Sequence, residues 1–214
     1  MAEPDWFRHE HWNEDIAANF ETRLSRARSG RSEYLRIQAS ILAATRQIEY
    51  AATAIELAKR HLDAKPNGIF AAWIYATIAQ AYETLGDKSS VVEAYRQAIR
   101  CEYARPNVRG NVYIQFAWFA TSNSLSELYD EVLDAIQNNK QDGDLVFSVT
   151  RYYFFASMAF ILDEKGDKDS SKRMAENALE AASICVGPFA RHPTVGVMTA
   201  ERDVHRERLE RLAR

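Results

Sequence analysis

The chain contains few of the residues that interrupt helices or cross-link a fold, with 8 glycines, 5 prolines and 2 cysteines among 214 residues. So few helix breakers favour long helices over a sheet connected by many turns. The cysteines, Cys101 and Cys185, are far apart and match no metal-binding or redox spacing. We therefore expect both to be small core residues of a protein in a reducing compartment.

A strong excess of one charge is also missing, because 27 Lys and Arg residues face 30 Asp and Glu residues. A surface that binds nucleic acid or anionic membranes needs a clustered basic excess. The most apolar stretch, 146–162, contains Arg151 and falls short of the roughly 20 apolar residues that span a bilayer. The first residues contain no apolar signal core. We expect a soluble, cytoplasmic protein that binds neither nucleic acid nor membrane.

The sequence does contain a repeated pattern. Residues 79–98 and 159–178 both place Gly-Asp-Lys between two apolar stretches with helical periodicity. Alignment of the second stretches adds two weaker copies, so that equivalent segments begin at Ala54, Val91, Leu128 and Ser171. A helix-turn-helix unit repeated at steps of 37, 37 and 43 residues predicts an α-solenoid.

Periodicity and breakers predict the individual helices. Asn13 is a good N-cap, followed by Glu14 and Asp15. Pro106 should open the sixth helix and Ser124 should cap the seventh, while a polar loop is expected over 138–144. In the charged C-terminal helix, Arg206 and Glu210 can pair at i,i+4. The predicted helices with both ends assigned cover about 13–28, 49–62, 106–122, 146–164 and 170–184. Three more begin at about 32, 124 and 199, and two helices flank Gly86-Asp87.

The repeated unit resembles the tetratricopeptide repeat (TPR), which has small and aromatic residues at fixed positions around a Gly-Asp-like turn. The second unit matches best, with Ile78, Ala79, Tyr82, Gly86, Asp87, Tyr95 and Ala98, although Val91 stands where a small residue is expected. The first unit matches at Ala54 and Pro66, and the third at Phe119 and Ala135. The fourth unit matches at Met158, Ala159, Leu162, Gly166, Asp167, Ala175 and Ala178. The resemblance implies an all-α, right-handed α-solenoid of about four TPR-like helical hairpins, with capping helices at both termini.

The whole chain also resembles a family of uncharacterised bacterial proteins with such a repeat core. The residues that carry this resemblance are Trp6-Phe7, Trp12-Asn13-Glu14, the run 34–39, Pro106-Asn107-Val108-Arg109, His192-Pro193 and Val195-Gly196. It implies no particular activity, because one solenoid fold serves many functions.

In the TPR family, the first helices of successive hairpins line a concave groove that binds a peptide or helix of a partner protein. The resemblance maps this partner-binding groove onto Arg36, Arg46, Trp73, Gln80, Glu83, Tyr113, Tyr153, Phe160 and Asp163. Small residues between them, such as Ala39, Ala43 and Ala76, are expected to leave room for the ligand. The groove positions that hold acidic chaperone tails in some TPR proteins lack suitable side chains here, since they are Ala39, Ala43, Thr77, Gly110 and Ile114.

The N-terminal segment carries three large aromatic residues. Trp6, Phe7 and Trp12 either pack over the first hairpin as a cap or form an exposed recognition element, and the need to cover the end of a solenoid favours the cap. We therefore divide the chain into an aromatic segment and capping helix (1–31), a TPR-like solenoid (32–185) and a loop with a C-terminal capping helix (186–214).

Catalytic motifs are missing. His9 and His11 have no third metal ligand nearby, His61 lies at a packing position, and His192 precedes a proline. No phosphate-binding loop or nucleophile elbow occurs. We expect a protein without enzymatic activity or cofactor, which acts as a scaffold for a protein or peptide partner. The alternatives are a dedicated chaperone or neutralising, immunity-like protein for one partner, and a self-associating structural subunit.

Overall fold

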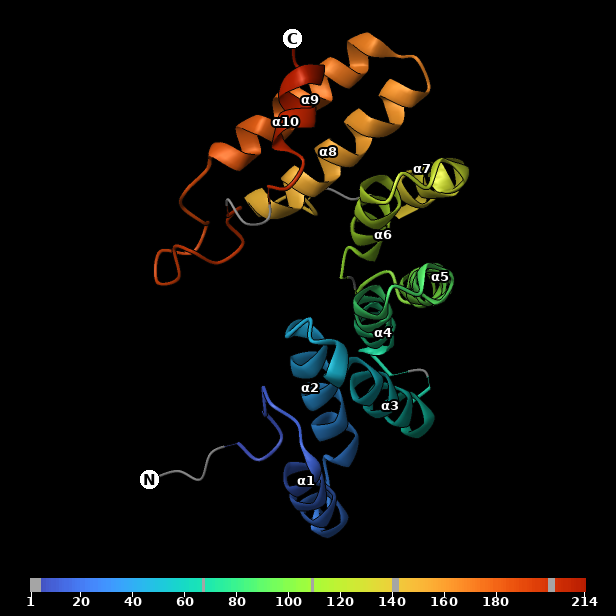
Figure 1. Ribbon diagram of the computed structural model, residues 1–214, viewed down its shortest axis with the longest axis vertical. Helices are drawn as coiled ribbons and strands as arrows, with labels where there is room; N and C mark the ends of the chain where they lie inside the picture. Colours follow the sequence, from blue (N-terminus) through green and yellow to red (C-terminus); the bar gives the residue numbers. More distant parts are fainter. Residues whose placement is uncertain (1–4, 67, 109, 140–142, 200–202) are drawn as a thin grey trace. The chain divides into compact units, whose positions relative to one another are not determined.

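The computed structural model describes residues 5–66, 68–108, 110–139, 143–199 and 203–214, and all regular structure within these ranges is helical (Figure 1). The helices divide between two compact units, Met1–Val112 and Tyr113–Arg214. In chain order they are α1 (Glu14–Arg26), α2 (Arg31–Ala44), α3 (Ile48–Ala64), α4 (Ala71–Leu85), α5 (Lys88–Ala104), α6 (Val112–Ser122), the 3-10 turn η1 (Ser126–Leu128), α7 (Tyr129–Asn139), α8 (Ser148–Glu164), α9 (Lys168–Ser183) and α10 (Arg206–Leu212). The prediction of an all-helical chain is confirmed for this part of the protein.

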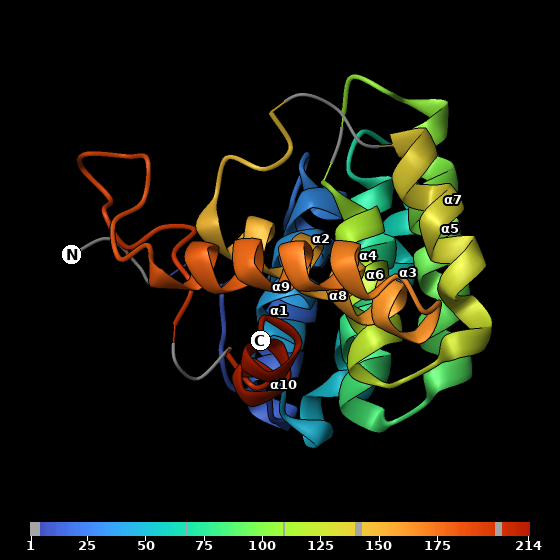
Figure 2. The same cartoon turned by 90° about the horizontal axis from the view of Figure 1, so that it is seen from above.

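The first unit is built from two helical hairpins. Helices α2 and α3 pack against each other, as do α4 and α5, and α4 also contacts α3 and α2. Alanines fill much of the space between these helices, and Ala39, Ala54, Ala58, Ala79 and Ala98 are completely buried. The predicted helices around Gly86-Asp87 are present as α4 and α5, and from α2 to α5 each helix packs against the next one in the chain (Figure 2).

The N-terminal aromatic residues pack on the first unit. Trp6 contacts Phe20 of α1 and Tyr34 of α2, with ring centroids 5.4 and 4.8 Å apart, and Trp12 contacts Phe20 at 5.4 Å. Phe20 is completely buried beneath them. Asn13 caps α1, as predicted, because its side chain accepts a hydrogen bond from the Ile16 amide at 2.9 Å.

A buried amide fixes the same N-terminal segment. Gln38 of α2 is completely buried, and its side chain accepts a hydrogen bond from the His9 amide at 2.9 Å and donates one to the His9 carbonyl at 2.7 Å. These reciprocal bonds imitate the pairing of two backbone segments. They satisfy a buried polar side chain that would otherwise destabilise the fold.

The Gly-Asp turns have the local structure that their sequence predicts. Gly86 and Gly166 adopt left-handed backbone conformations, with φ of 74° and 86°, which glycine adopts without steric cost. Asp87 and Asp167 then cap α5 and α9 by accepting hydrogen bonds from the amides of Ser90 and Ser170. Both repeats thus end one helix and begin the next in the same way.

The second unit contains α6 to α10. Thr121 of α6 donates a hydrogen bond to Ser157 of α8 at 3.3 Å, and Tyr129 of α7 donates one to Glu164 of α8 at 3.4 Å. Helices α8 and α9 form a hairpin, and α10 contacts both α9 and α8, as α4 contacts both α3 and α2. The expected pair between Arg206 and Glu210 of α10 is present at 3.0 Å.

Two helix starts differ from the sequence prediction. Helix α6 begins at Val112 because the carboxylate of Glu102, which is 1% exposed, accepts hydrogen bonds from the amides of Gly110 and Val112. Ser124 adopts a left-handed conformation with φ of 52°, and the η1 turn precedes α7. Ser124 is therefore no helix cap.

Other expectations need adjustment. Cys185 is exposed and Cys101 is half-buried, so the prediction of two core cysteines was wrong. Helix α10 begins at Arg206, later than expected. The predicted loop over 138–144 begins with Asn138 and Asn139 still in α7. Asn67, Arg109, residues 140–142 of the predicted loop and residues 200–202 of the predicted C-terminal helix lie outside the described residues. Within the described ranges, no helix is both long and apolar enough to traverse a lipid bilayer.

The cap of α5 generates a pH-dependent prediction. Hydrogen bonds from the hydroxyl and amide of Ser90, and from the hydroxyl of Ser89, lower the pKa of Asp87 to about 2 because they favour the ionised carboxylate. A depressed pKa in the folded state stabilises the protein above the ordinary aspartate pKa of about 4. This stabilisation should disappear as the pH falls from there towards 2.

We expect Asp87→Asn to reduce the loss of unfolding free energy between pH 4 and pH 2, because asparagine caps a helix without ionising. Urea unfolding monitored by circular dichroism across this range measures the effect. Asp134→Asn, at an exposed position of α7, controls for the loss of one charge. Equal pH dependence of the wild type and Asp87→Asn would contradict this role of Asp87.

A second prediction concerns the packing of α10. Leu209 is completely buried against α8 and α9, whereas Leu85 at the end of α4 is 42% exposed. Leu209→Ala should lower the unfolding free energy by roughly 2–5 kcal/mol, as expected for a buried leucine. Leu85→Ala should have a much smaller effect. A similarly small loss in both variants, measured by urea unfolding, would show that α10 contributes little to the core.

Candidate interaction surface

The nine residues predicted to form a groove are divided between the two units. Arg36 lies on α2, Arg46 follows α2, and Trp73, Gln80 and Glu83 lie on α4 in the first unit. Tyr113, Tyr153, Phe160 and Asp163 lie on α6 and α8 in the second.

A partly exposed cation–aromatic stack lies on the first unit. The guanidinium carbon of Arg36 is 4.2 Å from the centroid of the Phe70 ring. Phe70 in turn stacks on Trp73, with centroids 5.6 Å apart and an interplanar angle of 29°. Trp73 remains 45% exposed. We call Arg36, Phe70 and Trp73 together the Trp73 face.

Both ends of the Trp73 face are held in place. Arg36 donates a hydrogen bond from Nε to Glu33 at 2.8 Å, which fixes the guanidinium over the ring of Phe70. On the other side, the backbone of Gly110 lies so close to Trp73 that a Cβ atom there would be 2.0 Å from the indole Nε1. Glycine thus permits a close approach that other residues would prevent.

Arg46 and Glu83 are brought together and form a structural contact. Arg46 adopts a left-handed conformation with φ of 57° and donates a hydrogen bond to Glu83 at 2.8 Å. Glu83 also accepts one from the hydroxyl of Tyr95 at 2.9 Å. Burial, followed by the nearby Glu83 carboxylate, raises the pKa of Tyr95 well above its usual value. Glu83 thereby joins α4, α5 and the turn after α2.

The small residues have a different role from the one expected. Ala39 and Ala43 of α2 are 0% and 2% exposed, and Ala76 and Thr77 of α4 are both 9% exposed. Ser40 and Thr77 lie 3.4 Å apart across the two helices. These small residues are therefore packed within the first unit, and they do not form an open floor. Gln80, between Trp73 and Glu83 on α4, is partly exposed.

In the second unit, two predicted groove residues belong to the core. Tyr113 is 1% exposed and donates a hydrogen bond to Asp144 at 2.9 Å. Phe160 is completely buried, because Arg208 and His205 of the C-terminal segment lie against its ring, at 3.9 and 5.5 Å from its centroid. Neither ring offers an exposed surface to a partner.

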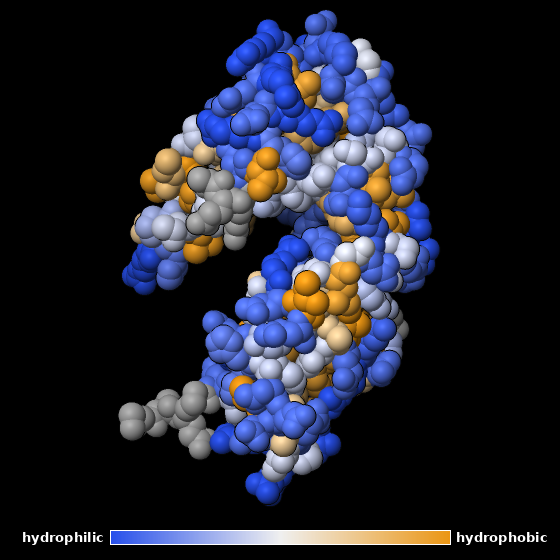
Figure 3. All heavy atoms as spheres, viewed as in Figure 1, coloured by the Kyte–Doolittle hydropathy of each residue, from blue (hydrophilic) through white to orange (hydrophobic). Residues whose placement is uncertain are grey.

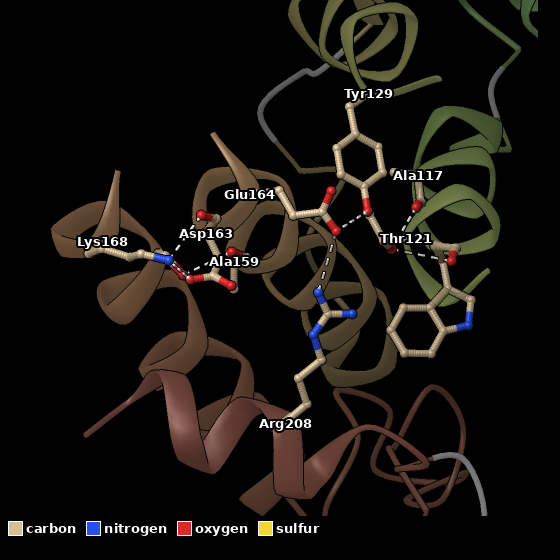
Figure 4. A network of polar contacts seen from close by, with 10 residues as sticks. Ala117, Thr121, Tyr129, Ala159, Asp163, Glu164, Lys168 and Arg208 are labelled. Atoms are coloured by element: carbon tan, nitrogen blue, oxygen red, sulfur yellow. Dashed lines mark hydrogen bonds and ion pairs between the residues drawn. The ribbon is translucent and has the colours of Figure 1, made fainter. Parts of the chain in front are cut away.

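The other two residues of the second unit are partly exposed. Tyr153 packs on Trp118 with centroids 4.6 Å apart, and Asp163 forms an ion pair with Lys168 at 2.5 Å (Figure 4). The same view shows Glu164 between Tyr129 and Arg208. Burial and then the Glu164 carboxylate raise the pKa of Tyr129 to about 12, so its hydroxyl remains a donor at neutral pH.

The C-terminal segment thus covers part of the face of α8 on which a partner was expected, at Phe160. Asp203 accepts a hydrogen bond from Tyr152 at 2.6 Å, and His205 lies 5.3 Å from Trp118 between ring centroids. Burial and the Arg208 guanidinium lower the pKa of His205, which favours its neutral form at pH 7. The sequence indicated a C-terminal helix, but no local signal showed which helix it would cover.

Exposed apolar side chains occur in separate patches among polar ones on the face shown in Figure 3. Phe70 is the member of the Trp73 face that the groove mapping missed. Its position directly before α4, three residues from Trp73, is the sequence signal that could have indicated the pair.

Metal-binding geometry is absent from the described ranges, where no three His, Cys, Asp or Glu side chains converge. His61, expected at a packing position, is 1% exposed, and its Nδ1 lies 2.7 Å from the carbonyl oxygen of Ser32. Comparison with protein-family models, curated proteins and solved structures finds no match. What this surface binds must therefore be inferred from its own residues.

The contact between Gly110 and Trp73 is testable. Gly110→Ala should displace the indole, because the new methyl group would overlap it, and the exposed side chain has solvent to move into. We expect one of the four indole N–H resonances to shift strongly in a ¹H–¹⁵N NMR spectrum, with little loss of helicity. Unchanged indole resonances would show that Trp73 does not pack on Gly110.

Proposed function

We propose that this protein is a non-catalytic scaffold that binds a peptide or helix of a partner protein on the Trp73 face. In this proposal the helical hairpins form a right-handed, TPR-like α-solenoid, and the protein acts in the cytoplasm. The observation that carries the proposal is the exposure of Trp73 in a fixed position between Phe70 and Gly110.

The composition of the Trp73 face supports a protein partner. Tryptophan and arginine are enriched at the residues that dominate binding energy in protein interfaces. A side chain that is already held in place loses less conformational entropy when it binds, which favours affinity.

Arg36 offers the polar part of such a contact. Among the described residues, only its Nε makes a hydrogen bond, to the carboxylate of Glu33. The Nη1 and Nη2 groups are therefore available to donate to a carbonyl or carboxylate of the partner. An extended or helical segment with an apolar side chain next to an acidic or backbone acceptor would satisfy both Trp73 and Arg36.

The partner-binding role is tested by copurification from the native cell with Trp73→Ala and Arg36→Ala. Tyr103→Ala is a matched control, because Tyr103 is an aromatic residue of α5 with 47% exposure, against 45% for Trp73. We expect Trp73→Ala to weaken the partner's binding at least about tenfold, as for a hot-spot residue, while Tyr103→Ala retains it. Circular dichroism establishes that each variant is folded.

The pattern of partners separates this proposal from its alternatives. Several partners lost together indicate a scaffold, whereas one stoichiometric partner indicates a dedicated chaperone or neutralising protein on the same face. Self-association would appear as a mass that rises with concentration in light scattering. Identical partners at identical yield in the wild type and both Trp73-face variants would refute binding on this face.

A further inference from the structure

A second concave site lies on the first unit, between α3, α4 and α5. Its cavity has a volume of about 330 Å³, within the lower range of small-ligand pockets. The apolar lining includes Leu62 of α3 and Ile78 of α4, which are 8% and 4% exposed. Tyr75 and Tyr82, both from α4, add two aromatic rings to the wall.

The cavity is separate from the Trp73 face. Residues seven apart on an α-helix lie on the same side, so Tyr75 and Tyr82 share one side of α4 and Trp73 and Gln80 share another. A rotation of about 100° per residue places these two sides roughly opposite each other. A ligand in the cavity would therefore leave the Trp73 face accessible.

The charged groups at the cavity favour a cation. Asp63 enters from α3 and Glu93 from α5, whereas Lys59 is the only cation among the described residues that line it. Glu93 accepts a hydrogen bond from Gln97 at 2.7 Å, which orients its carboxylate. Within the described residues, Asp63 and Lys59 make no hydrogen bond or ion pair, so the Asp63 carboxylate is available to a ligand.

The tyrosines add an attraction for a cation that has an apolar surface. Burial, the Cys101 thiol and then the nearby Asp63 carboxylate raise the pKa of Tyr75, so its ring stays neutral at pH 7. Neutral aromatic rings attract organic cations through their quadrupole, and quaternary ammonium groups suit such sites especially well. Apolar walls, aromatic rings and carboxylates are thus combined in one cavity.

We propose that this cavity binds an organic ammonium group, whose alkyl part contacts Leu62, Ile78 and the tyrosines and whose charge is balanced by Asp63 and Glu93. The ammonium group can come from a small amine or from a lysine side chain of another protein. Both sources share the same recognition chemistry.

Choline and 3,3-dimethylbutan-1-ol are suitable probes, because they have nearly the same shape and differ in charge. We expect NMR titration of the full chain to show saturable shifts around the cavity with choline. The neutral alcohol should bind at least about fivefold more weakly, which corresponds to about 1 kcal/mol, the upper value for a cation–π contact at an exposed site. A titration with Nα-acetyl-lysine methylamide distinguishes the lysine source, which is favoured if it binds more tightly than choline.

Two single substitutions should change the affinity in opposite directions. Glu93→Gln keeps the size of the side chain and should weaken choline binding severalfold, whereas Lys59→Gln removes the competing cation and should strengthen it. Trp73→Ala should leave choline binding unchanged, so failure of this site and failure of the Trp73 face are distinguishable. The absence of choline binding, equal binding of the neutral alcohol, or weaker choline binding by Lys59→Gln would overturn the proposal.

Discussion

The packing of α2 to α5 through small side chains is the constraint on which the first unit depends. Ala39, Ala43 and Ala76 are nearly or completely buried, and a larger side chain at any of these positions would displace its neighbours. Because protein interiors are tightly packed, such a displacement would reach the contacts built between α2 and α4. The stack of Arg36 on Phe70 joins α2 to the residue before α4. The ion pair between Arg46 and Glu83 joins the turn after α2 to α4.

One helix therefore serves two surfaces. Trp73 and Gln80 lie on one side of α4, and Tyr75 and Tyr82 lie on the other, while the buried Ala79 and Ala81 anchor the helix between its neighbours. The same rigid element positions the aromatic residues of both proposed sites. Since each site takes its charged residues from different neighbouring helices, the two have distinct chemistry: an arginine borders the first, and carboxylates border the second.

Local signals in the sequence predicted the helices well. Gly86-Asp87 and Gly166-Asp167 specify a left-handed glycine and a helix cap within a few residues, and Asn13 caps α1 in the same local way. The start of α6 depends instead on Glu102, a carboxylate from the preceding helix that binds amides eight and ten residues later. The burial of Phe160 depends on residues more than forty positions away. Neither could be read from local sequence, because both depend on packing between elements.

The C-terminal helix has a consequence for assembly. Its inner side carries Leu209, while Arg206, Glu207 and Arg211 are exposed on its surface. A stack of similar hairpins that ended in an apolar helix could add the next molecule end to end, and such a head-to-tail contact grows into an open filament. The charged surface of α10 opposes that growth, because adding a molecule there would require the desolvation of several charges.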